Sequence, residues 1–275
     1  MEMKMKDVLQ ATSFRFNKAL GQNFISDTNL LKGIVADSGV KEGDIVVEIG
    51  TGAGTLTRQI AEVAKKVYSF EVDKNLIPVH ELSLQGLDNV DVIFRDVLKM
   101  KDEEFKSIVG DGDFKVVANL PYYITTPLIM RFLESDLKVT SLTIMVQEEV
   151  GRRLVAKPNT ADYSAITLAV LLRGSATITR KVNRNMFYPA PNVDSAVVRI
   201  DVEEGKLDGE DKALVHRLVR SAFAMRRKTL VNNLNASMGL TKAEATEKLQ
   251  NAGLDERVRG EALSLEDYIR LSHQF

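Results

Sequence analysis

The chain has 275 residues and a formal net charge of -1, with 44% hydrophobic and 27% charged residues. This composition is typical of a globular protein, and the length allows one large α/β domain plus a smaller one. It has no cysteine and three scattered histidines, which excludes disulfides, thiolate metal sites and cysteine nucleophiles and argues against a histidine metal site. No apolar stretch suits a membrane span and residues 1–7 lack the apolar core of a signal peptide, so we expect a cytoplasmic protein with no metal and no membrane partner.

The N-terminal part of the chain alternates between apolar runs and amphipathic segments. Strands are predicted over residues 44–49, 66–72, 90–94, 114–118 and 139–146. Helices are predicted between them over residues 55–64, 74–84 and 127–133. This alternation indicates a parallel sheet with right-handed crossovers, so functional side chains should gather at the carboxyl ends of the strands.

The C-terminal part has a different pattern. Strands are predicted over 176–182 and 195–202, on either side of Phe187-Tyr188-Pro189-Ala190-Pro191. The charged stretch 203–211 suits a linker, and helices are predicted over 212–237, 241–252 and 264–272. The sequence therefore predicts an α/β domain over residues 1–204 and a small helical domain over residues 205–275.

A glycine-rich turn follows the first strand of the predicted sheet. Gly50, Gly52 and Gly54 stand at alternate positions, where a missing Cβ lets the backbone pass close to a ligand. This spacing differs from the Gly-x-Gly-x-x-Gly pattern of dinucleotide sites. Glu48, just before the turn, can either orient the polar end of a ligand or brace the turn.

Acidic residues end the next two strands. Glu71 stands where a carboxylate can accept both hydroxyls of a ribose, and Asp96 where a carboxylate can receive an adenine amino group. These features favour S-adenosylmethionine as a ligand. NAD stays open from this segment alone, because it shares the ribose carboxylate.

The fourth strand ends in Asn119-Leu120-Pro121-Tyr122-Tyr123. The lone pair of the adenine N6 atom is delocalised into the ring, and this nitrogen gains positive charge when it attacks a methyl group. The amide oxygen of Asn119 and the carbonyl oxygen of Leu120, held by Pro121, can accept both N6 hydrogens and stabilise that charge. Tyr122 can stack on the extruded base. The segment therefore favours methyl transfer to adenine by positioning, without a metal or a covalent intermediate, and it argues against NAD.

Basic residues cluster although the net charge is close to zero. A charged run is often only a solvated face, but clusters on both sides of a candidate active site favour contacts with nucleic acid. The two clusters are Arg217, Arg220, Arg226, Arg227 and Lys228, and Arg180, Lys181 and Arg184.

Nearly the whole chain resembles the small-subunit (16S) ribosomal RNA adenine N6,N6-dimethyltransferase family. The segments that carry the resemblance occur in the family's order: residues 20–27, 48–57, 119–124, 146–150, 187–195 and 223–230. The resemblance implies a Rossmann-like class I S-adenosylmethionine-dependent methyltransferase domain with a small α-helical C-terminal domain. One departure is Thr51, where the family more often has proline, and it bears on the geometry of the turn.

The resemblance also implies roles for particular residues. Phe187 is implied to form a second aromatic wall beside the target adenine, although its sequence context alone favours a core position. The catalytic set is Asn119, Leu120, Pro121, Tyr122 and Phe187. The cofactor-binding set is Asn23 and Ile25 (through the backbone), Gly50, Gly52, Glu71, Asp96 and Asn119. The RNA-binding set is Arg220, Arg226, Arg227 and Lys228.

The expected activity is N6,N6-dimethylation of two adjacent adenines in the loop near the 3′ end of small-subunit rRNA. The substrate would be an immature small ribosomal subunit, and we expect the enzyme to be a monomer. Alternatives are a large-subunit rRNA dimethyltransferase of the antibiotic-resistance type and a non-catalytic ribosome-assembly factor of the same fold. A DNA adenine methyltransferase fits less well, because those enzymes usually have an acidic residue at the position of Asn119.

Overall fold

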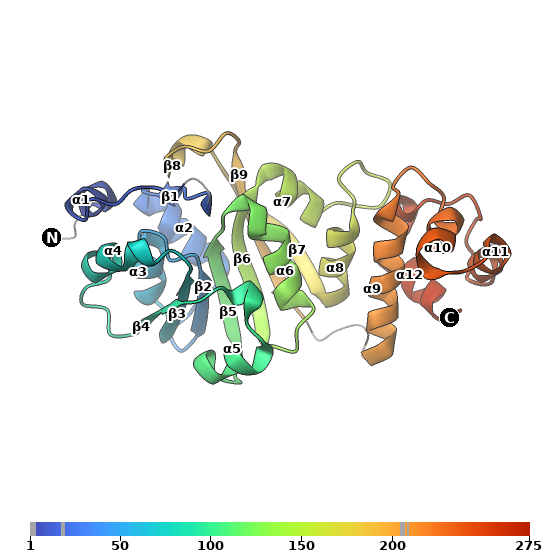
Figure 1. Cartoon of the computed structure of the whole chain (residues 1–275), viewed down its shortest axis with the longest axis horizontal. Helices are drawn as coiled ribbons and strands as arrows, with labels where there is room; N and C mark the ends of the chain where they lie inside the picture. The colour runs from blue at the N-terminus through green and yellow to red at the C-terminus, as the bar shows by residue number, and fades with distance from the viewer. Residues whose placement is uncertain (1–3, 18–19, 204–206, 208) are drawn as a thin grey trace. The chain divides into compact units, whose positions relative to one another are not determined.

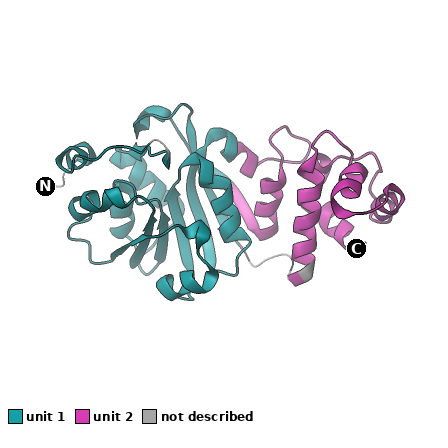
Figure 2. Cartoon of the chain, in the orientation of Figure 1, with its two compact units in different colours: residues 1–151, 177–202 teal, residues 152–176, 203–275 magenta. Residues whose placement is uncertain are grey.

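The computed structural model describes residues 4–17, 20–203, 207 and 209–275. The chain forms two compact units, Met1–Gly151 with Thr177–Val202, and Arg152–Ala176 with Glu203–Phe275 (Figure 2). The predicted domain boundary between residues 204 and 205 lies outside the described residues. The second unit also contains residues 152–176, which the sequence placed in the larger domain. No helix among the described residues is long and apolar enough to cross a bilayer.

The first unit is built on a seven-stranded sheet of order β4-β3-β2-β5-β6-β9-β7 (Figure 1). The strands are β2 (Ile45–Ile49), β3 (Lys66–Glu71), β4 (Val90–Phe94), β5 (Phe114–Asn119), β6 (Val139–Gln147), β7 (Gly174–Val182) and β9 (Ser195–Val202). Neighbouring strands from β4 to β6 run parallel, as predicted. β9 instead runs antiparallel to β6, with Ser195 opposite Gln147.

Helices cover both faces of the parallel strands, which is why the central strands β2, β5 and β6 are mostly buried and rich in apolar residues, whereas the edge strand β4 is half-buried or exposed. On one face, α2 (Thr28–Ser38) and α3 (Thr55–Ala61) bury Ile34 and Ile60 against Val67 and Val117. On the other face, α5 (Asp102–Val109) and α6 (Thr125–Leu133) bring Phe105 and Phe132 to the sheet. The Phe105 ring stacks on Phe70 of β3 at a centroid distance of 5.7 Å.

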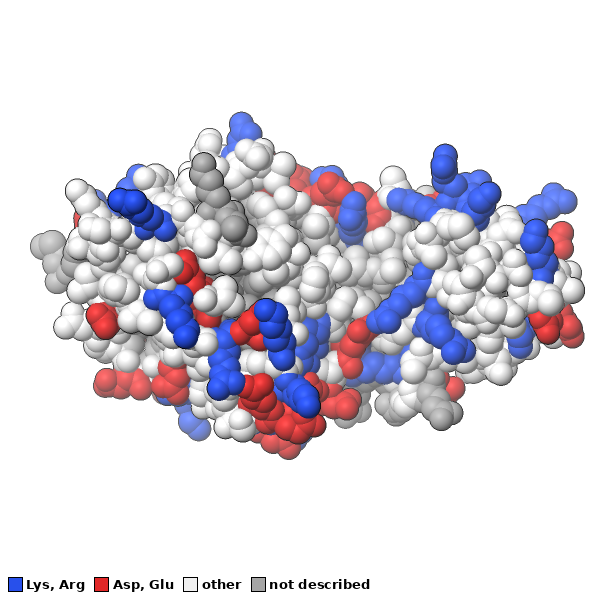
Figure 3. All heavy atoms as spheres, viewed as in Figure 1, with Lys and Arg blue, Asp and Glu red and all other residues white. Residues whose placement is uncertain are grey.

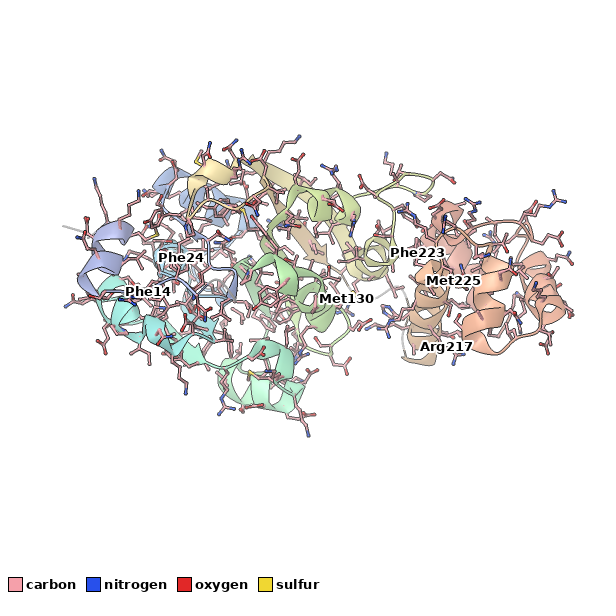
Figure 4. The ribbon with its side chains drawn as sticks, turned by 45° about the horizontal axis from the view of Figure 1, so that its top comes forward. Phe14, Phe24, Met130, Arg217, Phe223 and Met225 are labelled. Carbon is pink, nitrogen blue, oxygen red and sulfur yellow. The ribbon has the colours of Figure 1, made fainter. Side chains whose placement is uncertain are left out.

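An N-terminal segment packs near the glycine turn. It contains α1 (Met5–Ala11) and β1 (Phe24–Ile25), which pairs antiparallel with β8 (Phe187–Tyr188). The rings of Phe14 and Phe24, labelled in Figure 4, lie 6.0 Å apart between centroids. Phe24 and Met5 belong to the same buried cluster as Ala53 of the glycine turn, so α1 and β1 are packed next to that turn.

Within the described part of the first unit, the remaining helical segments are short. They are η2 (Lys74–Leu76), α4 (Ile77–Ser83), η3 (Val97–Lys99), η4 (Tyr122–Ile124), α7 (Glu148–Leu154, which continues into the second unit) and η5 (Arg184–Met186). The helix predicted over 74–84 is therefore a 3₁₀ turn followed by an α-helix.

The described part of the second unit is helical apart from the start of β7. Its elements are α8 (Ala165–Arg173), α9 (Gly209–Ala224), α10 (Leu230–Met238), α11 (Lys242–Asn251), η6 (Gly260–Ala262) and α12 (Leu265–Ser272). The prediction of one helix over 212–237 is wrong, because the chain turns between α9 and α10. Thr229 caps α10 by accepting from Asn232 N, and the buried Asn233 amide donates to Ala222 O and Met225 O at the end of α9.

Candidate functional site

A cavity of about 480 Å³ opens at the carboxyl ends of β2, β3, β4 and β5 in the first unit. The predicted cofactor-binding and catalytic residues all line it: Asn23, Ile25, Gly50, Gly52, Glu71, Asp96, Asn119, Leu120, Pro121, Tyr122 and Phe187. Strand ends that lie far apart in the sequence thus meet at one site, as a parallel sheet requires.

The glycine turn has a backbone that other residues rarely adopt. Gly50 has φ 81° and Gly52 has φ 53°. A Cβ on Gly52 would lie 3.1 Å from the Phe24 ring, so a side chain would meet both strain and crowding. Glu71 Oε2 accepts from Gly52 N at 3.0 Å, and the buried His80 imidazole lies 2.9 Å from Gly52 O. Burial lowers the pKa of His80, so the neutral ring donates to this carbonyl.

A chain of buried hydroxyls lies beneath the turn. Glu48 Oε2 accepts from Thr57 Oγ1 and from Ser69 Oγ, each at 2.6 Å. Burial raises the pKa of Glu48 to about 8. Glu48 is fully buried and is absent from the cavity wall. Two roles were expected for this carboxyl group, which were to orient a ligand or to support the glycine turn. Its position fits the support of the turn.

Two carboxylates face the cavity from the ends of β3 and β4. Glu71 Oε1 accepts from Val72 N and Asp73 N, at 2.7 and 2.9 Å. Asp96 accepts from Leu98 N at 3.1 Å and pairs with Lys99 at 3.3 Å. Backbone donors thus hold both acids in place. Glu71 Oε1 already accepts two hydrogen bonds, so Glu71 Oε2 and the Asp96 carboxylate are the acceptors left for a further donor.

The loop before β1 forms another wall of the cavity. Gln22 donates to Asp73 Oδ2 at 2.7 Å and accepts from Asn17 N at 2.8 Å. Ile25 O accepts from the Thr55 hydroxyl at 3.0 Å. These bonds tie the loop to the ends of β3 and of the glycine turn. The sequence predicted Asn23 and Ile25 here but gave no role to Gln22.

The Asn119 side chain has a defined orientation. Its Nδ2 donates to Asn23 O at 3.1 Å. A carbonyl can only accept, so the nitrogen faces Asn23 and the amide oxygen faces away. This oxygen has no hydrogen-bond partner among the described residues, and Asn119 lines the cavity. The site therefore offers a fixed acceptor at the end of β5.

Two aromatic residues line the same cavity as Asn119. The Tyr122 hydroxyl and the buried Ser195 hydroxyl are 2.8 Å apart, and burial raises the pKa of Tyr122. Phe187 is 5% exposed and packs with the core cluster that includes Leu31, yet it also lines the cavity. The core position and the wall position expected for Phe187 are thus compatible. Ser195 was not predicted as a site residue, because its partner is distant in the sequence.

The basic residues of the RNA-binding set belong to the second unit. Arg220 is exposed on α9, whereas Arg226, Arg227 and Lys228 lie in the turn after α9 rather than on a helix face. Arg226 pairs with Glu261 at 2.8 Å and donates to Ala161 O at 2.6 Å. Figure 3 shows Lys and Arg side chains gathered over this unit, and Figure 4 labels Arg217 on α9.

Known proteins resemble the chain along almost its full length. The model of the family described as "Ribosomal RNA adenine dimethylase" matches residues 13–275. A protein of Clostridioides difficile named "Ribosomal RNA small subunit methyltransferase A" is 43% identical over 270 residues, which cover 98% of this chain and 93% of that protein.

Two solved structures share the fold. A dimethyladenosine transferase from Plasmodium falciparum matches with a TM-score of 0.73 at 25% identity, covering 90% of this chain and 95% of that one. The 23S rRNA methyltransferase ErmE matches with a TM-score of 0.69 at 25% identity, covering 92% of this chain and 99% of that one. The architecture is thus that of class I methyltransferases, as the sequence predicted.

Proposed function

Because the chain belongs to the ribosomal RNA adenine dimethylase family, we propose that it transfers methyl groups from S-adenosylmethionine to two adjacent adenines of small-subunit rRNA. Each adenine, in the loop near the 3′ end, receives two methyl groups on N6. The observation that carries this proposal is the single cavity lined by both the acidic strand ends and the Asn119–Tyr122 segment.

The cavity residues fit the cofactor. Gly50 and Gly52 line the cavity without a Cβ, while Glu71 and Asp96 present acceptors for ribose hydroxyls and an adenine amino group. Apolar side chains, among them Phe70, also line the cavity and suit a flat base. When bound, S-adenosylmethionine supplies an electrophilic methyl group whose sulfur leaves as a neutral thioether.

At the target base, the protein's part is to position and to stabilise charge. The free amide oxygen of Asn119 accepts one N6 hydrogen, and the carbonyl oxygen of Leu120 accepts the other. The Tyr122 ring stacks on the extruded adenine, with Phe187 as the second wall. As the nitrogen bonds to the methyl carbon it becomes cationic, and both oxygens stabilise it.

The proton then leaves the nitrogen without a strong base. The product ammonium is acidic, so solvent accepts its proton. Because burial raises the pKa of Tyr122, its hydroxyl stays protonated at neutral pH and holds the ring to Ser195. Tyr122 thus acts as a stacking residue and not as a base. A second round at the same nitrogen gives the dimethylated product.

The second unit contacts the RNA backbone in this proposal. Arg220, Arg227 and Lys228 are exposed cations that meet phosphates. The substrate is an immature small subunit, which offers both phosphates and shape. The protein works as a cytoplasmic monomer.

The large-subunit alternative is supported by the similarity to ErmE, which is named as a 23S rRNA methyltransferase. The small-subunit proposal is supported by the similarity to the Clostridioides difficile protein, which is named as a small subunit methyltransferase. Identity is 25% in the first case and 43% in the second, which supports the small subunit. A non-catalytic assembly factor would bind subunits without methylating them.

The deciding experiment incubates the protein with methyl-labelled S-adenosylmethionine and ribosomal subunits from a strain that lacks the corresponding activity. We expect label in immature small subunits, mapped to two adjacent N6,N6-dimethyladenosines near the 3′ end. Label in large subunits supports the resistance-type alternative. Binding without label supports the assembly factor.

A further inference from the structure

Tyr123 is the most exposed of the large hydrophobic side chains among the described residues, at 61%. It nevertheless lines the same cavity as Asn119 and Tyr122. Its hydroxyl has no hydrogen-bond partner in the described part of the chain, whereas that of Tyr122 is bonded to Ser195. An isolated exposed aromatic residue is ordinary on a protein surface. One at the mouth of a base-binding cavity is placed to meet what enters it.

The backbone around Tyr123 is well fixed. Pro121 precedes it, and Ile124 N donates to Pro121 O at 3.1 Å to close a 3₁₀ turn. Gly21, from the loop before β1, lies next to this turn, and a Cβ built on it would be at ordinary contact distance, 3.6 Å from Pro121 Cβ and 3.9 Å from the Tyr123 ring. The ring is therefore presented from a braced turn.

We propose that Tyr123 stacks on the nucleotide next to the target adenine, outside the cavity. This inference rests on the proposed function. When one adenine is extruded into the cavity, the neighbouring base loses its stacking partner, and an exposed aromatic face can replace it. Tyr122 and Tyr123 are consecutive, so one short turn receives the target base and its neighbour. Tyr123 is thus a positioning residue for the strand, distinct from the residues that touch N6.

With two adjacent target adenines, the same arrangement serves both rounds. One adenine occupies the cavity while the other lies on Tyr123, and a shift by one nucleotide exchanges them. Stacking has no strict sequence requirement, because every base has a π-face. Tyr123 therefore holds the strand without contributing to the choice of base.

The test compares Tyr123→Phe, Tyr123→Trp, Tyr123→Leu and Tyr123→Ala on immature small subunits. KM and kcat are measured at saturating S-adenosylmethionine, together with the cofactor Kd and the melting temperature. We expect the Phe and Trp variants to remain within about twofold of wild type, and the Leu and Ala variants to raise KM by about five- to 150-fold. Cofactor Kd and melting temperature should not change.

Leu82→Ala is the control, since Leu82 is an exposed apolar residue of the same unit that does not line the cavity. The stacking role is overturned if the KM of Tyr123→Leu equals that of Tyr123→Phe. It is also overturned if the Leu and Ala variants lose cofactor affinity instead of showing a higher KM for the subunit. A wild-type protein that methylates no small-subunit adenine would instead overturn the proposed function.

Discussion

The hydroxyl oxygens of Thr51 and Ser69 lie 2.6 Å apart beneath the glycine turn, and both residues are buried. Ser69 donates its hydrogen to Glu48, so the Thr51 hydroxyl donates to Ser69. A proline at position 51, which the family resemblance leads us to expect, would fix the backbone torsion itself. Here a side-chain bond anchors the turn to β3.

Thr51→Val should therefore weaken cofactor binding by about two- to tenfold, the equivalent of one hydrogen bond. Isothermal titration calorimetry with S-adenosylmethionine measures this directly. Thr51→Ser keeps the hydroxyl and serves as the control. In a Ser69→Ala background the same Thr51→Val change should cost little more, because the bond is already lost. If Thr51→Val weakens cofactor binding equally in the wild-type and Ser69→Ala proteins, the two hydroxyl groups do not act together.

Stability should fall between about pH 4.5 and 8 because of Glu48, whose pKa rises from 4.5 to about 8 on folding. In this window the folded protein holds a proton that the unfolded chain has lost. The free energy of unfolding therefore decreases as the pH rises, by at most about 1.4 kcal/mol per pH unit. The decrease levels off above pH 8.

Glu48→Gln removes this titration and keeps a polar side chain of similar size. The free energy of unfolding is measured by urea denaturation at pH 5, 6, 7 and 8 and plotted against pH. The slope of this plot should be less steep in the variant, by an amount equivalent to the uptake of up to one proton. Parallel stability profiles for the two proteins would show that Glu48 is ionised when folded.

The sequence patterns predicted the positions of the strands better than the direction in which neighbouring strands pair. The predicted bounds of β4 and β9 match the structure at both ends, because each strand is rich in β-branched residues and is flanked by polar residues. The direction of β9 could not be predicted, since the side-chain period is the same in parallel and antiparallel strands. The break between α9 and α10 was missed, because it depends on Thr229 and Asn233, whose types also occur within helices.

The site was predicted through residues that end strands. Topology brings Glu71, Asp96 and Asn119 to one edge, so their meeting follows from the order of elements. Ser69 and Ser195 were not predicted, because their roles come from hydrogen bonds to residues that are distant in the sequence. A serine in a strand gives no signal of such a partner.

Asn233→Ala should destabilise the protein by about 1–3 kcal/mol. The fully buried amide donates to Ala222 O and Met225 O, and the variant loses both bonds, although Met225 O still accepts from Lys228 N. Urea denaturation measures the change. Asn235→Ala is a matched control, because it removes a bond to Leu240 O at 2.6 Å on the exposed surface, and it should cost less than about 1 kcal/mol. Similar losses in both variants would contradict a role for burial.

Arg227→Ala and Lys228→Ala should weaken binding to small subunits and each reduce the slope of log K against log salt by about 1. Both side chains are exposed, which suits phosphate contacts. Arg226→Ala should instead lower stability, since Arg226 is held by Glu261 and Ala161 O. Binding titrations at salt concentrations from about 50 to 200 mM measure this slope, because affinity that depends on phosphate contacts falls strongly over that range. An unchanged slope in the Arg227 and Lys228 variants would contradict phosphate contacts.

The most direct test of the central claim is to measure methyl transfer and cofactor binding side by side for Asn119→Ala. The variant lacks the oriented amide oxygen at the end of β5 but keeps Glu71 and Asp96 in the cavity. We predict a loss of about 10²- to 10³-fold in kcat on immature small subunits, with S-adenosylmethionine still bound. Wild-type turnover by Asn119→Ala would contradict the assignment of this cavity as the site where the adenine amino group is methylated.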